Sequence, residues 1–128
     1  MWLIFDVRQM KKLVCASGTE RFTIFQADDG HFCCPVCGAA DLSIAPYTEH
    51  GGASFEMCEC GFEFGFDDSP LASAEAVDGI RANWRRWRRK VIDEASRDAE
   101  ALERLERQLK NIGVRLAFDL IDVEDEPA

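Results

Sequence analysis

Two short pairs of cysteines constrain the fold of this chain more than any other sequence feature. Cys34 and Cys37 are separated by two residues, Cys58 and Cys60 by one, and a glycine follows each pair. Two such pairs are the sequence form of a zinc ribbon, in which two tight turns each supply two thiolates to one tetrahedral ion. Glycine suits the residue after each turn because it adopts a positive φ without steric cost. The sequence therefore predicts a zinc site at these four cysteines.

The second pair is one residue shorter than the usual spacing, and this leaves three interpretations of the cysteines. All four bind one zinc ion, or Cys33 replaces one of them as a ligand, or the cysteines are reduced and buried in a hairpin that has lost its metal. A disulfide framework is disfavoured, because no secretory signal pattern precedes the cysteines and we expect a cytoplasmic protein in a reducing compartment.

Further motifs extend from residue 32 to residue 92. They are C-P-x-C-G, then S-F-E-M-C, then C-G-F-E-F-G-F-D-D, and then Trp84 and Trp87. The pattern resembles small bacterial cysteine-rich proteins of the C-P-x-C-G / C-C-G-F-E-F-G type, in which a helix with spaced tryptophans follows the ribbon. Those proteins normally have a fuller second cysteine pair than the one here. The resemblance implies an immunity or accessory role in bacterial competition systems.

The length of 128 residues suits one compact domain. We divide that domain into an N-terminal β-hairpin at 1–30, a zinc-ribbon-like core at 31–68, a helical segment at 71–112, and a strand with an acidic tail at 114–128. The predicted class is α+β, with a small antiparallel sheet. No apolar run approaches the ~20 residues that a membrane-spanning helix needs, so we expect no membrane partner.

Short runs rich in β-branched and aromatic residues, separated by glycine and aspartate turns, predict the strands. These runs span residues 2–7, 12–16, 21–26, 42–45, 53–57 and 62–66. In the last run Phe62, Phe64 and Phe66 share one face, and Phe55 alternates with Met57 in the run before it. We expect these aromatic side chains to form the core of the ribbon.

Apolar residues recur with a helical period from Leu71 to Ile112. Ser69 or Ser73 marks the predicted start of the helix. An unbroken helix over 73–112 would be about 60 Å long, which exceeds a domain of this size. Either the helix breaks near residues 96–98, which we favour, or its second half projects and needs a partner or a second copy. Residues 114–123 then resume a strand-like alternation and could add an edge strand.

Catalysis has little support in the sequence. His31 and His50 are the two histidines, and neither accompanies a nucleophile motif. The chain also lacks a phosphate-binding loop and the motifs of zinc proteases and serine hydrolases. We therefore expect a protein that is not an enzyme.

The run of arginines and tryptophans at 84–90 is the candidate for nucleic-acid binding, because arginine grips phosphates and aromatic rings stack on bases. However, Trp84 and Trp87 lie three residues apart on the apolar stripe, so we expect them to fasten the helix to the phenylalanines. The net charge of −9 also disfavours nucleic acid, because most of the surface would repel phosphates. A nucleic-acid-associated accessory factor is the alternative function.

Residues 41–80 contain nine acidic side chains and no lysine or arginine. Carboxylates that crowd together repel each other, so this concentration suggests an external use. We expect a non-catalytic binding module of immunity or antitoxin type, whose partner is a protein, such as a toxin or effector, with a basic cleft. The predicted contact residues are Asp67, Asp68, Glu75 and Asp78 for charge, with Leu102, Leu105 and Leu109 for apolar contact.

Overall fold

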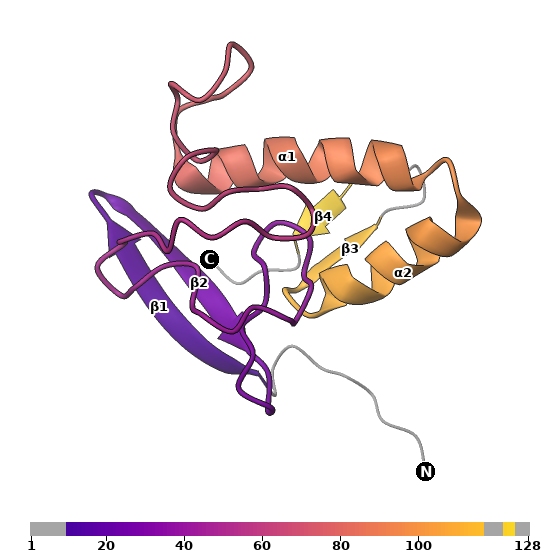
Figure 1. The fold of residues 1–128 in the computed structure, drawn as a ribbon, viewed down its shortest axis with the longest axis horizontal. Helices are drawn as coiled ribbons and strands as arrows, with labels where there is room; N and C mark the ends of the chain where they lie inside the picture. Colours follow the sequence, from indigo (N-terminus) through magenta and orange to yellow (C-terminus); the bar gives the residue numbers. More distant parts are fainter. Residues whose placement is uncertain (1–9, 117–121, 125–128) are drawn as a thin grey trace.

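The computed structural model describes residues 10–116 and 122–124 (Figure 1). Its elements are β1 (Lys11–Ser17), β2 (Glu20–Gln26), α1 (Ile80–Ala95), α2 (Ala99–Lys110), β3 (Val114–Leu116) and β4 (Asp122–Glu124). A long irregular segment, 27–79, lies between the β1–β2 hairpin and the helices. The fold is a small α+β fold, as predicted. Within the described residues neither helix is long and apolar enough to cross a membrane.

The β1–β2 hairpin is antiparallel and joined by a two-residue turn, in agreement with the sequence. Its register runs from Lys11 opposite Gln26 to Ser17 opposite Glu20. One face of the hairpin is buried, as the alternation of side chains requires. Cys15, Phe22 and Ile24 lie on that face. The other predicted N-terminal strand, 2–7, is outside the described residues.

The strands predicted at 42–45, 53–57 and 62–66 do not form. Single bridges hold these runs instead, at Phe32–Leu42, Tyr47–Ala53 and Met57–Glu63. The backbone adopts a positive φ at Phe55, Gly61 and Gly65, and each such residue turns the chain out of the extended conformation. The backbone of the ribbon-like core therefore forms no regular strands, although some of its aromatic side chains are buried as predicted.

Only two of the three phenylalanines expected on one face are in the core. Phe62 and Phe64 are fully buried, whereas Phe66 is 52% exposed. Phe66 follows Gly65, whose φ of 99° bends the chain, so its ring leaves the common face. Phe55 is also exposed, so the prediction that it belongs to the core was wrong.

A cluster of aromatic rings joins the hairpin, the irregular segment and α1. The ring of Phe22 on β2 lies 5.1 Å from both Tyr47 and Trp84, in edge-to-face geometry. Trp87 makes a similar contact with Phe62 at 5.6 Å. Edge-to-face pairs at these distances are favourable beyond the area they bury. The expected attachment of the helix to the ribbon phenylalanines is thus confirmed for Trp87, whereas Trp84 packs on Phe22 of the hairpin and on Tyr47.

Helix α1 begins at Ile80, later than the sequence suggested. Ser69 and Ser73 form tight turns of their own, in which their hydroxyls accept from the amides of Leu71 and Glu75. The free amides at the start of α1 are satisfied instead by Glu20 of β2. Its two carboxylate oxygens each accept one hydrogen bond of 2.9 Å, from the amides of Ile80 and Arg81. A cap supplied from a distant strand leaves no local sequence signal.

The helical segment breaks at residues 96–98, as favoured from the sequence. The side chain of Asp98 caps α2 by accepting a hydrogen bond of 3.1 Å from the amide of Glu100. After α2, β3 pairs with β4 in a separate antiparallel ribbon. The C-terminal strand therefore does not extend the β1–β2 sheet.

Because the helical segment breaks, most of the leucines that were expected to contact a partner are buried within the chain. Leu105 is 5% exposed and Leu109 is fully buried in the chain's own core, while Leu102 is half-buried. The structure thus corrects the expectation that Leu105 and Leu109 face a partner, and the expectation for Leu102 stays a prediction. The physical reason is that α2 folds back after residue 98 and packs its apolar stripe internally.

We expect Glu20→Ala to lower the free energy of unfolding by about 1 kcal/mol, because two amides at the start of α1 lose their acceptor. Glu20→Gln, which keeps one acceptor oxygen, should lose less. Urea denaturation measures both variants. Glu49→Ala, a change at an exposed loop carboxylate, is the control and should stay within about 0.5 kcal/mol of wild type. Equal stability of Glu20→Ala and wild type would show that the cap contributes nothing.

Candidate metal centre

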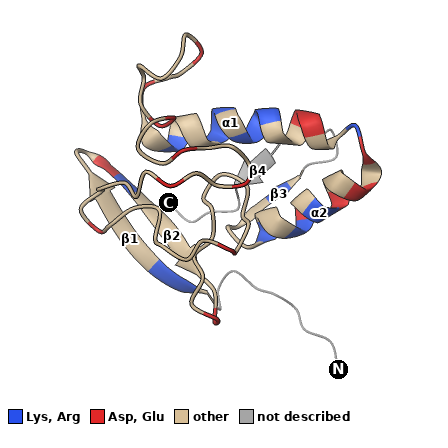
Figure 2. Ribbon diagram, in the orientation of Figure 1, with Lys and Arg blue, Asp and Glu red and all other residues tan. Residues whose placement is uncertain are grey.

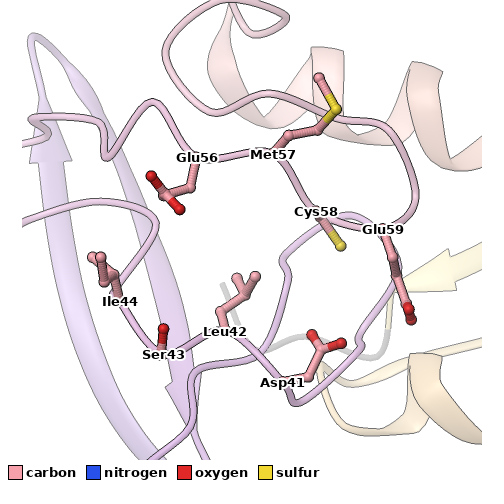
Figure 3. Close-up of a pocket in the computed structure, with 8 residues that line it drawn as sticks. All are labelled: Asp41, Leu42, Ser43, Ile44, Glu56, Met57, Cys58 and Glu59. Atoms are coloured by element: carbon pink, nitrogen blue, oxygen red, sulfur yellow. The ribbon is translucent and has the colours of Figure 1, made fainter.

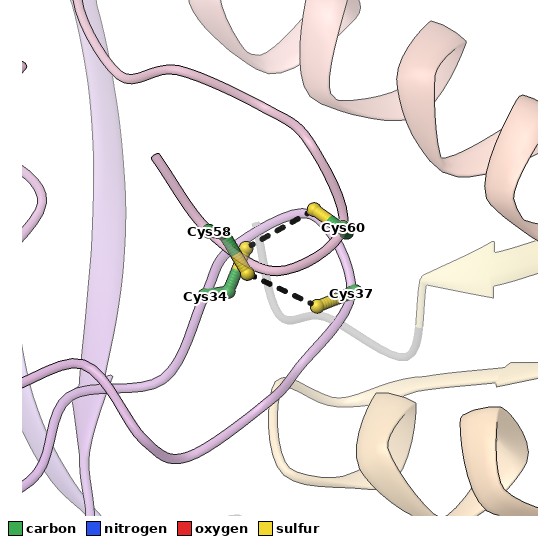
Figure 4. A group of neighbouring side chains, drawn as sticks. All are labelled: Cys34, Cys37, Cys58 and Cys60. Carbon is green, nitrogen blue, oxygen red and sulfur yellow. Dashed lines mark hydrogen bonds between the residues drawn. The ribbon is translucent and has the colours of Figure 1, made fainter. Parts of the chain in front are cut away.

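The four predicted cysteines converge on one point (Figure 4). Their sulfur atoms all lie within 4.8 Å of one another. The sulfur of Cys34 is 3.9 Å from that of Cys60, and the sulfur of Cys37 is 3.6 Å from that of Cys58. A tetrahedral zinc ion with Zn–S bonds of about 2.3 Å requires sulfurs about 3.8 Å apart. These two separations fit a zinc tetrathiolate and each joins the two cysteine turns.

The first cysteine turn is closed by backbone hydrogen bonds. The amide of Gly38 donates to the carbonyl of Cys34 at 2.8 Å, and the amide of Cys34 donates to Ala39 at 2.9 Å. The amide of Val36 points at the sulfur of Cys34, at 3.4 Å. Amides directed at a thiolate stabilise its negative charge. The loop is therefore shaped to present sulfur to a cation.

The second cysteine turn also directs two sulfurs to the cluster, although its cysteines are separated by one residue fewer. The amide of Gly61 donates to the carbonyl of Cys58 at 2.8 Å, which closes a turn one residue tighter than that at Cys34. The amide of Cys58 then donates to Phe62 at 3.0 Å. The shorter spacing is absorbed in the turn, and both Cys58 and Cys60 reach the cluster.

The glycines after the two turns serve both conformation and packing. Gly38 has a φ of 84° and Gly61 a φ of 93°. A Cβ atom on Gly38 would lie 2.0 Å from the carbonyl oxygen of Gln108 on α2, and one on Gly61 would lie 3.3 Å from the ring of Trp87 on α1. Glycine is thus required for the turns and also lets each helix approach a turn closely.

Two neighbouring residues of α1 hold the two turns from outside. The guanidinium of Arg88, only 1% exposed, donates hydrogen bonds of 2.7 Å to the carbonyls of Pro35 and Val36 in the first turn. The indole of Trp87 donates to the carbonyl of Cys60 in the second, at 3.0 Å. Groups outside the ligands orient a metal site in this way, and Arg88 also brings a positive charge toward a cluster that would be negative with zinc bound.

Sequence reasoning missed Arg88 because it was grouped with the exposed basic run. A signal was nevertheless present: Arg88 stands four residues after Trp84 and four before Ile92, and all three side chains are buried on one face of α1. A single arginine on an apolar stripe indicates a buried charge with dedicated partners. A further contact comes from the residue that follows α2, Asn111, whose side-chain amide donates to the carbonyl of Gly38 at 2.9 Å.

The four thiols perturb one another. Burial, together with the neighbouring thiols, holds the pKa of Cys34 well above its ordinary value. Hydrogen bonding to the sulfurs of Cys34, Cys37 and Cys60 holds the pKa of Cys58 well below its ordinary value. Four thiolates this close together would repel one another, and a bound metal ion would balance their charge.

A metal ion held by all four sulfurs would be structural, because a tetrahedral ion would then keep no coordination position for a substrate or an activated water. Three of the four cysteines are buried and Cys60 is half-buried. Cys33 does not belong to the cluster. Its side chain is fully buried, and burial together with Asp29 and Asp41 raises the pKa of its thiol to about 11.

Two of the carboxylates expected to face a partner support the irregular segment instead. Asp67 accepts a hydrogen bond of 2.8 Å from the amide of Glu63. Asp68 accepts from the hydroxyl of Tyr47 and, at 3.0 Å, from the amide of Gly65. Both are half-buried. These two carboxylates therefore stabilise the loop at the end of the ribbon through hydrogen bonds.

The other two predicted carboxylates are on the surface. Glu75 forms an exposed ion pair with Lys90 of α1, at 3.2 Å. Asp78 is exposed just before α1. An exposed ion pair contributes little to stability, so neither residue is committed to the fold.

Comparisons of this chain with protein-family models, with curated proteins and with solved structures found no match. The site is therefore interpreted from its own geometry.

We expect protein purified without a chelator to contain about one zinc ion per chain. Cys37→Ala should reduce this to less than about 0.2, whereas Cys33→Ala, an equally buried change outside the cluster, should retain it. A strong chelator should lower the melting temperature of the wild type. Elemental analysis and thermal melts measure these outcomes. Metal-free wild-type protein that melts normally would show that the packed cysteines need no ion.

We expect Arg88→Gln to weaken zinc binding by about 10- to 100-fold, because the carbonyls of the first turn lose their donors. Competition with a chromophoric chelator measures the affinity. Arg104→Gln, on the exposed face of α2, is the charge-matched control. Ile92→Val controls for general destabilisation of α1, because Ile92 is buried but makes no hydrogen bond to a cysteine turn. An equal loss of affinity in Ile92→Val and Arg88→Gln would assign the effect to folding alone.

Proposed function

We propose that this chain is a non-catalytic protein-binding module whose irregular centre is held by a structural zinc ion. The closed set of four thiolates supports a structural ion, and zinc is the metal for which four sulfurs in a tetrahedron are typical. The sequence offers no nucleophile motif to support catalysis. What remains for function is the surface that the metal centre organises.

The observation that carries a protein-binding role is the charge on that surface. Of the nine carboxylates in residues 41–80, six are exposed: Asp41, Glu49, Glu56, Glu59, Glu75 and Asp78. The irregular segment carries red but no blue in Figure 2, whereas lysines and arginines lie mainly on the helices and the hairpin. A single-sign surface of this kind speeds association with a partner of opposite charge.

The partner class we propose is a protein with a basic cleft, such as a toxin or effector that this chain neutralises. The resemblance to small cysteine-rich bacterial proteins supports an immunity or antitoxin role. A carboxylate-rich surface also suits a cleft that otherwise holds phosphates, because it offers negative charge in the same place.

Binding of nucleic acid through α1 is less well supported. Arg88 is used internally, and Lys90 is paired with Glu75. Arg86 is half-buried and its Nε donates to the side chain of Asn83 at 3.3 Å. Part of the basic run therefore makes contacts within the chain. The test below also measures binding of nucleic acid, the alternative function.

The test starts with a pulldown and mass spectrometry, followed by stopped-flow kinetics with the purified partner. We expect the association rate to fall about tenfold or more between low and physiological salt, while the dissociation rate changes less. Single-stranded and duplex DNA and RNA are assayed in parallel by fluorescence anisotropy. Salt-sensitive binding of nucleic acid that is lost in Arg85→Gln/Arg89→Gln, without any purified protein partner, would overturn the proposed function.

A further inference from the structure

A groove lies beside the second cysteine turn (Figure 3). Two stretches of the irregular segment, 41–44 and 56–59, form its walls, and its volume is about 220 Å³. Cys58, a ligand of the candidate metal centre, is part of the second wall. The groove is thus a distinct feature that the metal centre supports from one side.

The walls are fixed before any partner arrives. A bridge joins Leu42 to Phe32, and another joins Met57 to Glu63. The cysteine turn closes directly after Met57 through the bond from the amide of Gly61 to Cys58. A site whose walls are already positioned avoids much of the ordering cost of binding.

The lining combines apolar and acidic side chains. Figure 3 shows Leu42 and Glu56 directed toward the hollow from opposite walls. Ile44 is 55% exposed and Met57 is 62% exposed. Three acidic residues, Asp41, Glu56 and Glu59, complete the lining, which contains no basic residue. A mixed surface of this kind matches apolar side chains flanked by positive charge.

The residue just before the second wall has an unusual backbone conformation. Phe55 has a φ of 62°, the one positive value outside glycine among the described residues. Its ring is 66% exposed and lies over Gly65, where a Cβ atom would come within 2.6 Å of it. A bulky residue in this conformation is strained. The lining and charge of the groove, rather than this strain, support a binding role.

We propose that this groove is the docking site for an extended segment of a partner protein in which lysine or arginine flanks an apolar side chain. The apolar side chain enters beside Leu42 and Ile44, and the basic side chains pair with the carboxylates at the rim. This inference rests on the proposed protein-binding function and places it at one site. Charge complementarity decides the occupant, because residues 41–80 carry no lysine or arginine.

The test uses the full chain with zinc bound and three fluorescein-labelled peptides. The first alternates lysine with leucine and valine, the second replaces lysine with glutamate, and the third replaces leucine and valine with serine. We expect the first peptide to bind at physiological salt, and the other two at least about tenfold more weakly. Amide NMR shifts should concentrate at 41–44 and 55–59. Shifts that concentrate on another surface would overturn the proposal, as would absence of binding.

Matched variants separate the groove from general acidity. Asp41→Asn/Glu56→Gln/Glu59→Gln should weaken binding of the first peptide by at least about tenfold. The control Asp93→Asn/Glu94→Gln/Glu106→Gln changes the charge equally at exposed sites on the helices and should stay within about twofold. An equal loss in both triple variants would show non-specific charge attraction and overturn the site.

The apolar part of the groove is tested separately. Ile44→Ser, at a lining side chain that is 55% exposed, should weaken binding of the first peptide by about fivefold or more, and unchanged binding would overturn the apolar part of the proposal. Leu71→Ser, at a side chain that is 92% exposed and outside the groove, should leave binding unchanged.

The same variants applied to the purified partner distinguish the two proposals. A partner that binds the groove triple variant as tightly as wild type would overturn the docking site while the protein-binding function stands. Failure of the function itself would appear as nucleic-acid binding without a protein partner.

Discussion

The attachment of the two cysteine turns to helix α1 is the interaction on which the rest of this structure depends. The segment between β2 and α1 has no hydrogen-bonded ladder and is held by single bridges. Trp87 and Arg88, adjacent on one helix, each hold a different turn by bonds to its carbonyls. A metal ion would join those turns at their sulfurs. The same two turns would then be held by the ion at their side chains and by α1 at their backbone carbonyls.

The features that the sequence predicted correctly are those encoded by local patterns. Cysteine spacing located all four sulfurs, and alternation located the β1–β2 hairpin. The excessive length of an unbroken helix, about 60 Å, indicated the break that Asp98 caps. The spacing of Trp84 and Trp87 placed both on the packed side of α1. In each case neighbours in sequence determine the conformation, so no knowledge of distant contacts was needed.

The features that sequence reasoning missed depend on partners far away in the chain. Glu20 caps a helix sixty residues later, and Arg88 reaches carbonyls more than fifty residues earlier. Asp68 resembles a surface charge in sequence until Tyr47 is seen to donate to it. Leu105 and Leu109 would form the same apolar stripe whether they faced a partner or the chain's own core. They are buried because α2 folds back toward that core. Residue type sets what a side chain can do, but packing chooses among the possibilities.

The position of Cys58 links the metal centre to the groove. This residue belongs to the cysteine cluster that could hold a metal ion and also to the wall that carries Glu56, Met57 and Glu59. That wall has one bridge of its own, so its distance from the 41–44 wall depends on where the sulfur is held. Loss of a bound metal ion would therefore remove one of the constraints on this wall, while its bridge, its turn bond and the contact from Trp87 remain. An ion bound here would bear on partner binding, because the loop that it would hold is also part of the groove that we propose as the docking site.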